Sequence, residues 1–196
     1  MTNGASISSF GGGSIEFDGV DDYIDLNKAY TGSGGTELGY GSSVTYTLEA
    51  WIYPRSSQGS ALDADCIIGN TGSVGVGMQL GVSSSRPRMN YGARSTSNFY
   101  SSLFNYNEWT HVCLSKNSTT SVRTYLNGSF DVAAPSAGEL SISTSVSSGE
   151  MRIGNASPRV YGYYDGYIAV ARIYNSALTD DEVRQNYNAT KGRFGL

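Results

Sequence analysis

Apolar and polar residues alternate through most of this 196-residue chain, in short runs that end at Gly, Asn, Ser or Pro. The clearest run is VTYTLEAWIYP at residues 44–54, in which every even-numbered residue up to Ile52 is apolar. Alternation with a period of two places one face of a strand against a core, and Pro54 ends the run. Further strands are predicted in SIEFDGVDDYIDL, CIIGN, VGVGMQLGV, RPRMNYGA, NEWTHVCLSKNSTTSVRTYLNGSF and MRIGN.

The strongest hairpin signal lies at residues 107–130, where two alternating strands follow one another and the second closes on Asn127-Gly128. Asn-Gly is typical of a type I′ turn, because both central residues need positive φ. Many short strands joined by turns indicate two antiparallel sheets packed face to face. The predicted fold class is therefore an all-β, two-sheet antiparallel β-sandwich with one short C-terminal helix.

The helix is predicted directly after the last strand, DGYIAVARIY at residues 165–174. Thr179 is the expected N-cap: its hydroxyl can accept a hydrogen bond from the amide of Glu182, and the Glu182 carboxylate can accept one from the amide of Thr179. This reciprocal pair is a capping box. We expect the helix to end near residue 188 and Lys191-Gly192 to stop it.

Composition and charge narrow the possible partners. The formal net charge is −4 and only 15% of residues are charged, so a general attraction to phosphate backbones is missing and no nucleic-acid partner is expected. No apolar run is long enough to span a membrane. We expect one domain at residues 14–196, preceded by a flexible Gly/Ser-rich lead at residues 1–13 that lacks a signal peptide.

The two cysteines, Cys66 and Cys113, each lie inside a predicted strand. A chain without a signal peptide is normally assembled in a reducing compartment, so free buried thiols are the favoured interpretation. A disulfide between the two remains an alternative.

Six segments of the chain, taken in order, resemble the laminin-G-like, concanavalin-A-like jelly-roll family: SIEFDGVDDYIDL, YTLEAWIYP, EWTHVCLSK, TYLNG, MRIGN and DGYIAVARIYNSALTDDEV. The resemblance implies the jelly-roll fold for residues 14–189. The family includes lectins, adhesion modules, pentraxin-like proteins and appendages of glycan-active enzymes. It therefore implies a binding role without deciding which one.

Enzyme chemistry is not expected. Jelly-roll glycanases carry an acid and a nucleophile on one strand face, but no Glu-x-Asp-x-Glu pattern occurs here. Glu49 has no acidic residue within four positions, and Asp63 and Asp65 fall in a predicted loop. The only histidine, His111, has no acidic neighbour in its strand WTHVCL, so we interpret it as structural.

Calcium is the one metal that the residues suggest, and no other cofactor is required. Calcium prefers clustered carboxylate and carbonyl oxygens. Asp18 and Asp165 would meet if the first and last strands were neighbours, as the resemblance implies, and Asp21 and Asp22 are close in sequence. Asp-Gly is also ordinary turn chemistry, and this alternative stays open.

Two aromatic and arginine-rich stretches are candidates for binding a glycan or a protein partner. Sugar rings expose C–H patches between hydroxyls and suit flat aromatic faces beside polar side chains, but tyrosine and arginine are also enriched at protein interfaces. The candidates are Arg86, Arg88, Tyr91, Arg94, Phe99, Tyr100 and Tyr106 in the first stretch, and Arg159, Tyr161, Tyr163 and Tyr164 in the second.

Domains of this fold mostly work outside cells, yet this sequence starts at Met1 without an export signal. It resembles laminin-G-like proteins encoded by tailed bacteriophages. That resemblance implies a virion surface protein assembled in the host cytoplasm: a capsid decoration, a fibre or a tail-associated adhesion module. The implied partners are other virion proteins, further copies of the chain in a homo-oligomer, and surface polysaccharide. A free calcium-dependent lectin is the main alternative, and a polysaccharide hydrolase is a third.

Overall fold

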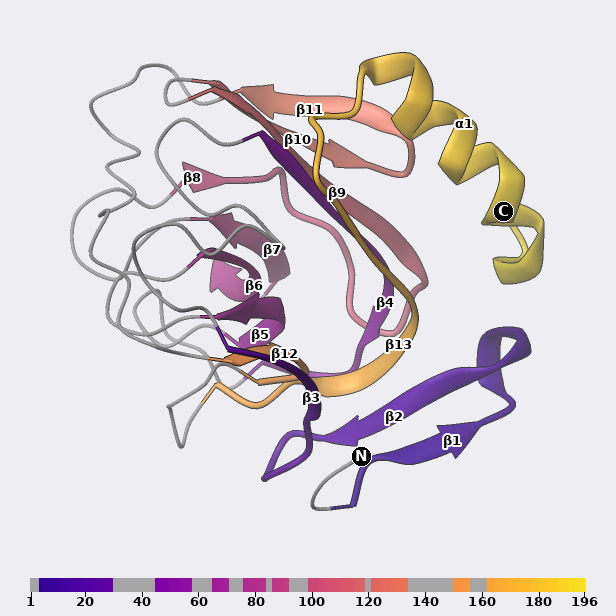
Figure 1. The fold of residues 1–196 in the computed structure, drawn as a ribbon. Coiled ribbons are helices and arrows are strands. Elements are labelled where there is room, and N and C mark those ends of the chain that lie inside the picture. Colours follow the sequence, from indigo (N-terminus) through magenta and orange to yellow (C-terminus); the bar gives the residue numbers. More distant parts are fainter. Residues whose placement is uncertain are drawn as a thin grey trace.

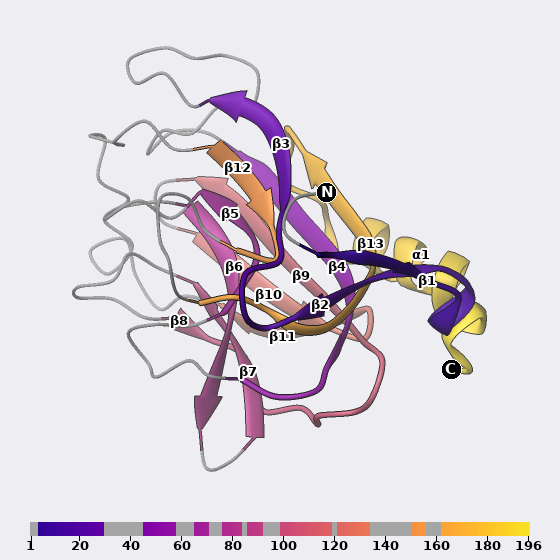
Figure 2. The ribbon, with the colours of Figure 1, turned by 90° about the horizontal axis from the view of Figure 1, so that it is seen from below.

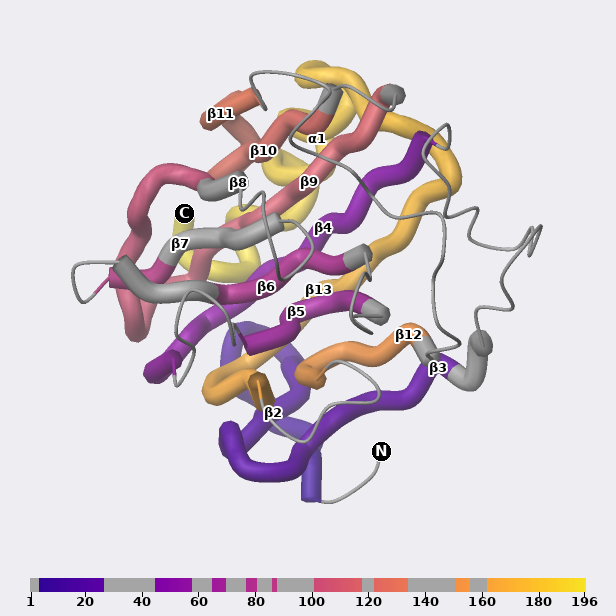
Figure 3. Tube along the Cα trace, turned by 90° about the vertical axis from the view of Figure 1, so that its left-hand side faces the viewer, coloured from indigo at the N-terminus to yellow at the C-terminus, as the bar shows by residue number. Residues whose placement is uncertain are grey.

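A computed structural model describes residues 4–29, 45–57, 65–70, 76–83, 86–91, 99–118, 121–133, 150–155 and 162–196. Two antiparallel sheets form a sandwich (Figures 1 and 3). The seven-stranded sheet has the order β1 (Ser6–Ser8), β2 (Ser14–Asp18), β13 (Asp165–Tyr174), β4 (Tyr46–Pro54), β9 (Thr110–Ser118), β10 (Ser121–Leu126), β11 (Ser129–Ala133). The six-stranded sheet has the order β3 (Ile24–Ala29), β12 (Glu150–Ile153), β5 (Asp65–Asn70), β6 (Val76–Ser83), β7 (Arg86–Tyr91), β8 (Phe99–Tyr100). The predicted fold class is confirmed.

The core lies between the two sheets and follows the predicted alternation. On β4 the even-numbered residues Tyr46 to Ile52 are buried in it, together with Val112 and Leu114 of β9. The six-stranded sheet contributes Met78 and Leu80 from β6. Each of the larger aliphatic side chains, such as Leu48 or Leu114, stabilises the fold by about 1.5–3 kcal/mol relative to exposure. The odd-numbered residues of β4 therefore face outward, away from the second sheet.

The helix α1 (Asp180–Thr190) covers this outer face of the seven-stranded sheet (Figures 1 and 2). Its capping box is confirmed, because the Thr179 hydroxyl accepts from the Glu182 amide and the Glu182 carboxylate accepts from the Thr179 amide. The α-helix ends at Thr190, two residues beyond the expected end, and Lys191 is its C-cap, in agreement with the predicted stop at Lys191-Gly192. The chain then forms the 3₁₀ helix η2 (Lys191–Phe194) and turns at Gly195, whose φ is +78°. Within the described ranges, no helix is long and apolar enough to cross a membrane.

The predicted turn at Asn127-Gly128 is also present. Both residues have positive φ, +49° and +73°, which fits the type I′ expectation. A Cβ at Gly128 would lie 2.7 Å from the ring of Tyr187, so this glycine also lets α1 approach the hairpin. The turn thus fixes both the pairing of β10 with β11 and the position of the helix.

Residues 4–13 differ from the predicted flexible lead. They form β1, which pairs with β2, and the 3₁₀ helix η1 (Phe10–Gly12). The Phe10 ring lies 4.9 Å from that of Tyr53 and 5.4 Å from that of Trp109, and Arg193 donates hydrogen bonds to the carbonyls of Gly11 and Gly13. The pairing of β1 with β2, the Phe10 ring and the Arg193 guanidinium together hold this Gly-rich segment.

Both cysteines are free and buried, in agreement with the favoured prediction. Cys66 lies on β5 and Cys113 on β9, in different sheets. Burial raises the pKa of each thiol well above its ordinary value, with a further contribution from Asp65 at Cys66 and from Glu49 at Cys113. The two thiols are therefore protonated and behave as small apolar core groups.

Candidate functional site

Three of the predicted calcium ligands come together where β2 turns into β3. Carboxylate oxygens of Asp18, Asp21 and Asp22 all lie within 4.8 Å of one another. The turn is held by these side chains themselves: Asp22 Oδ2 accepts from the amide of Asp18 at 2.9 Å, and Asp18 Oδ1 accepts from the amide of Val20 at 2.8 Å. The local sequence DGVDD thus folds into a compact acidic turn.

Asp22 carries a buried oxygen without a partner. Its side chain is almost fully enclosed, and Oδ1 makes no hydrogen bond to any described residue. Burial raises the pKa of Asp22, and the negative charges of Asp18 and Asp21 raise it further, although the hydrogen bond from the Asp18 amide opposes them. An oxygen-rich, negatively charged site of this kind fits the ligand preference of Ca²⁺.

Asp165 lies beside this turn but is engaged elsewhere. It pairs with Asp18 across β13 and β2, as the prediction requires. Its carboxylate, however, accepts from Arg55 Nε at 2.8 Å and from Ser56 Oγ at 2.6 Å. Arg55 also bonds Glu16 at 2.6 Å. The guanidinium therefore already supplies positive charge to Asp165, and the acidic cluster consists of Asp18, Asp21 and Asp22.

Only part of the predicted glycan-binding set has described side chains: Arg86, Tyr106, Tyr163 and Tyr164. For Arg88 and Tyr91 in β7, and for Phe99 and Tyr100 in β8, the strand alone is described. Arg94, Arg159 and Tyr161 lie outside the described residues, as does Asp63.

Among the described candidates, two are committed to structure. The Arg86 guanidinium donates to the Phe104 carbonyl at 3.2 Å and to the Asn105 side chain at 3.0 Å. Tyr164 is fully buried and packs edge-on against Phe17. The other two candidates, Tyr106 and Tyr163, remain partly exposed.

The two predicted stretches converge on the start of β5. Asp65, predicted in a loop, is fully buried there. Burial chiefly raises the pKa of both Tyr106 and Tyr164, and the charge of Asp65 contributes to each. The Asn107 amide donates to the Pro54 carbonyl at 2.8 Å, the Cys66 amide donates to the Gly162 carbonyl at 2.9 Å, and Gly166 pairs with Pro54. Tyr106 and the 163–164 pair therefore lie at the same end of the sandwich.

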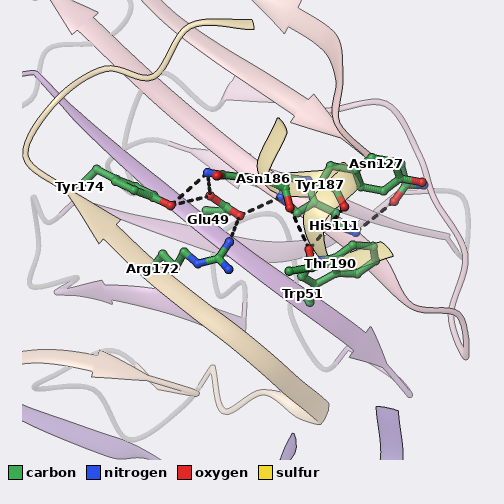
Figure 4. Close-up of polar contacts among 9 residues, drawn as sticks. All are labelled: Glu49, Trp51, His111, Asn127, Arg172, Tyr174, Asn186, Tyr187 and Thr190. Carbon is green, nitrogen blue, oxygen red and sulfur yellow. Dashed lines mark hydrogen bonds and ion pairs between the residues drawn. The ribbon is translucent and has the colours of Figure 1, made fainter. Parts of the chain in front are cut away.

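The outer face carries a buried polar network that the sequence patterns did not predict (Figure 4). Glu49 of β4 is fully buried, and its Oε1 lies 3.2 Å from His111 Nε2 and 2.6 Å from Arg172 Nη1. Its Oε2 accepts from Asn186 of α1 at 2.8 Å and from the Tyr174 hydroxyl at 3.2 Å. Glu49 of β4 is thus the acidic partner that His111 lacks within its own strand.

These partners decide the charge of Glu49. Burial alone would raise its pKa, but the hydrogen bonds and charges of His111, Arg172 and Asn186 outweigh it, so the pKa lies below its ordinary value. The carboxylate is ionised, fully bonded and closed off from solvent. It therefore joins α1 to the sheet, and His111 is fully buried within this network. Trp51 adds a hydrogen bond from its indole to the Thr190 hydroxyl at 2.9 Å.

An open cavity of about 430 Å³ lies on the same outer face, beside the start of α1. It is lined by Ser115, Asn117, Arg123, Tyr125, Ala177, Leu178, Thr179, Asp180 and Asp181. None of these residues was a sequence-based candidate. The signal that could have indicated them is the alternation on β9 and β10, which sends Ser115, Arg123 and Tyr125 to the face opposite the core.

Comparisons with solved structures give the same fold. Domain 4 of AbnA, a GH43 extracellular arabinanase from Geobacillus stearothermophilus in complex with arabinotriose, matches 93% of this chain and 81% of its own, at 16% identity and a TM-score of 0.61. The binding domain of Paraclostridial Mosquitocidal Protein 1 matches 95% of this chain and 46% of its own, at 16% identity and a TM-score of 0.65. A heptameric SAP-like pentraxin from Limulus polyphemus matches 82% of both chains, at 16% identity and a TM-score of 0.52.

Among curated protein sequences, no significant match is found. A family model does match: Laminin_G_3, described as the concanavalin A-like lectin/glucanases superfamily, aligns with residues 18–184. That range contains most of both sheets and the first turn of α1. The chain therefore belongs to the concanavalin A-like lectin/glucanase superfamily.

Proposed function

We propose that this protein is a non-enzymatic carbohydrate-binding module. The observation that carries the proposal is the match of residues 18–184 to a superfamily of lectins and glucanases. Two of the similar structures support it by what they are: an arabinanase domain in complex with arabinotriose and a putative carbohydrate-binding protein from Bacteroides ovatus. A catalytic role is not favoured, because Glu49 is sealed and fully hydrogen-bonded.

The proposed sugar site is the end of the sandwich that carries Tyr106 and Tyr163. Both tyrosines are partly exposed, and a tyrosine side chain combines a flat ring with a hydroxyl group. This combination suits a sugar, whose C–H patches pack on rings while its hydroxyls form hydrogen bonds. Arg86 lies near this end and holds the segment before Tyr106 in place through its bonds to Phe104 and Asn105.

We propose a structural Ca²⁺ in the acidic turn formed by Asp18, Asp21 and Asp22. The ion would supply positive charge to the partnerless Oδ1 of Asp22 and fix the path of the chain between β2 and β3. This turn favours the calcium-dependent lectin as the second candidate function. Asp165 is not required for it, because Arg55 already compensates its charge.

The setting that we propose is the surface of a bacteriophage particle, where the chain would contact other virion proteins and further copies of itself. The resemblance of the ordered strand segments to phage laminin-G-like proteins supports this. Purified particles would contain the chain at a fixed copy number by quantitative mass spectrometry. Recovery of the chain only in the unassembled fraction would contradict the setting but not the sugar-binding role.

A glycan array read with calcium and with chelator tests the binding role. We expect saturable binding that weakens by about tenfold, or about 1.4 kcal/mol, in Tyr163→Ala, because the ring face is lost. Tyr163→Phe should keep most of the affinity, and Asn188→Ala, on the exposed side of α1, should keep all of it. An array without binding in both conditions, or turnover of a bound polysaccharide, would contradict the proposal.

A further inference from the structure

The cavity beside α1 is a second candidate site, on the outer face and separate from the Tyr106 and Tyr163 end. We call it the β9–α1 pocket and define it by the nine lining residues given above. It lies between the β9–β10 strand pair and residues 177–181, where the chain enters α1. Its volume of about 430 Å³ falls in the range of small-molecule sites.

The floor of the pocket is preformed. Ser115 and Tyr125 are almost fully buried. The Ser115 hydroxyl donates to the Leu178 carbonyl at 2.9 Å, and the Tyr125 hydroxyl donates to Asp180 Oδ1 at 2.8 Å. These bonds tie β9 and β10 to the segment that starts the helix. A ligand would therefore enter a fixed shape and lose little affinity to ordering it.

The charges in and around the pocket cancel in pairs. Arg123 bonds Asp180 at 2.9 Å, and Arg184, just outside the pocket, bonds Asp181 at 2.6 Å. The Arg123 guanidinium also lies over the ring of Phe130, 4.4 Å from its centroid, which holds it in place. With no charge left uncompensated, the pocket favours neither an anion nor a cation. It favours a neutral ligand that can both donate and accept hydrogen bonds.

Several polar groups remain available for such a ligand. The Asn117 side chain is exposed, and it makes no hydrogen bond to a described residue. One carboxylate oxygen of Asp181 and the remaining N–H groups of Arg123 are not used in the two ion pairs. Ala177 and Leu178 are half-buried and add an apolar wall. Hydroxyl-binding groups beside an apolar wall match the two surfaces of a sugar ring.

We propose that the β9–α1 pocket binds one neutral sugar residue, as a second glycan subsite on the outer face of the seven-stranded sheet. This rests on the proposed carbohydrate-binding function but adds a site that the superfamily match does not assign. Two subsites on different faces would let one module contact two points of a branched or multivalent glycan, and linked binding events raise the overall affinity without new contacts.

Backbone amide NMR spectra of the ¹⁵N-labelled full chain test the pocket directly. The probes are the methyl glycosides of glucose, galactose, mannose and arabinose, with inorganic phosphate as a charged comparison. We expect saturable shifts at millimolar concentrations of one neutral glycoside for the amides of Ser115, Arg123 and residues 177–181. Phosphate should leave these amides unchanged.

Two variants make the assignment specific. Ala177→Trp fills the pocket and should weaken these titrations at least tenfold, whereas Ala189→Trp, at an exposed position of α1 outside the pocket, should not. Asn117→Ala removes a side chain that makes no hydrogen bond within the described part of the chain, so it should weaken binding while the melting temperature stays unchanged.

Absence of saturable shifts at these amides with every glycoside would overturn the inference, as would phosphate binding or unweakened binding in Ala177→Trp. Shifts confined to the amides near Tyr106 and Tyr163 would overturn the pocket while leaving the proposed function intact. Conversely, pocket shifts that persist in Tyr163→Ala, with an unchanged glycan array, would support the pocket and contradict the proposed main site.

Discussion

Two of the buried carboxylates in the described part of the chain, Glu49 and Asp22, have opposite surroundings. Glu49, on the outer face, has four polar partners, and its pKa lies below its ordinary value. Asp22, in the turn before β3, accepts a hydrogen bond from the Asp18 amide with one oxygen, whereas its other oxygen has no partner among the described residues. Two further aspartates lie beside it. Its pKa lies above its ordinary value. The fold compensates the first charge and leaves the second uncompensated.

The difference separates a structural charge from a candidate ligand. A buried charge costs several kcal/mol unless partners repay it, so Glu49 marks a network completed during folding. At Asp22, burial and the neighbouring aspartates disfavour the charged form, and an external cation would compensate that charge. Burial and ionisable type are alike in the two cases, and only the partners distinguish them. Hence we assign a structural role to Glu49 and propose a calcium-binding role for Asp22.

The largest expected effect is a loss of stability on removing the cation that compensates Glu49. Arg172→Met removes the cation from Glu49 and leaves the fully buried carboxylate with neutral hydrogen-bond donors and His111. Loss of one partner of a buried pair costs about 3–5 kcal/mol, and we expect about 3 kcal/mol because the Arg172 side chain is 34% exposed. Urea denaturation at neutral pH measures the free energy of unfolding.

Arg184→Met is the matched control. Arg184 pairs with Asp181 on the surface of α1, and both side chains are mostly exposed. Such surface pairs contribute about 0.2–1 kcal/mol. Equal losses of unfolding free energy in Arg172→Met and Arg184→Met would contradict the structural role of the Glu49 network. The contrast between Glu49 and Asp22 would then fail.

The second largest effect is expected at the acidic turn, where the charge of Asp22 has no compensating cation among the described residues. If Asp18, Asp21 and Asp22 hold Ca²⁺, the ion should raise the free energy of unfolding by about 2.7 kcal/mol at 100 times its dissociation constant. Asp22→Asn should abolish the increase, since it keeps an acceptor for the Asp18 amide but removes the charge. Thermal unfolding with calcium and with chelator measures both.

Asp181→Asn is the control for the loss of a carboxylate. Asp181 is exposed and lies far along the chain from the acidic turn. It should retain the full calcium-dependent stabilisation. An unchanged unfolding temperature of the wild-type chain on adding calcium would contradict the proposed site, and so would stabilisation that survives in Asp22→Asn.

Local features of the sequence predicted the fold well, because their physics involves only neighbouring residues. The Thr179 and Glu182 capping box and the Asn127-Gly128 turn each lie within four residues and have the predicted geometry. The Glu49 and His111 pair is 62 residues apart and depends on the register of β4 with β9. No local pattern states which strands become neighbours.

Two other features that the sequence did not predict also depend on contacts between distant residues. A register irregularity between Ile168 and Val170 shifts the side-chain alternation of β13, and this shift places Arg172 opposite Glu49. The Gly-rich composition of residues 4–13 suggested flexibility, but Phe10 finds an aromatic cluster built from distant strands. The acidic turn was predictable because its three aspartates are close in sequence. The β9–α1 pocket was not, because three separate elements line it.

The smallest effect is a difference in the sign of the pH dependence. The pKa of Glu49 is lowered by folding, so its contribution is present above the ordinary value of 4.5 and is lost as the pH falls through the folded pKa. The pKa of Asp22 is raised in calcium-free protein, so its contribution is present below the ordinary value of 3.8 and is lost as the pH rises through the folded pKa. Relative to Glu49→Gln, the wild-type chain should therefore gain stability as the pH rises through the acid range, whereas relative to Asp22→Asn it should lose stability. Denaturation series of the three proteins in chelator measure both differences, and slopes of the same sign would show that the two buried carboxylates are not opposites. Calcium should remove the slope at Asp22 and leave the slope at Glu49 unchanged, because only the first carboxylate lacks a cation of its own.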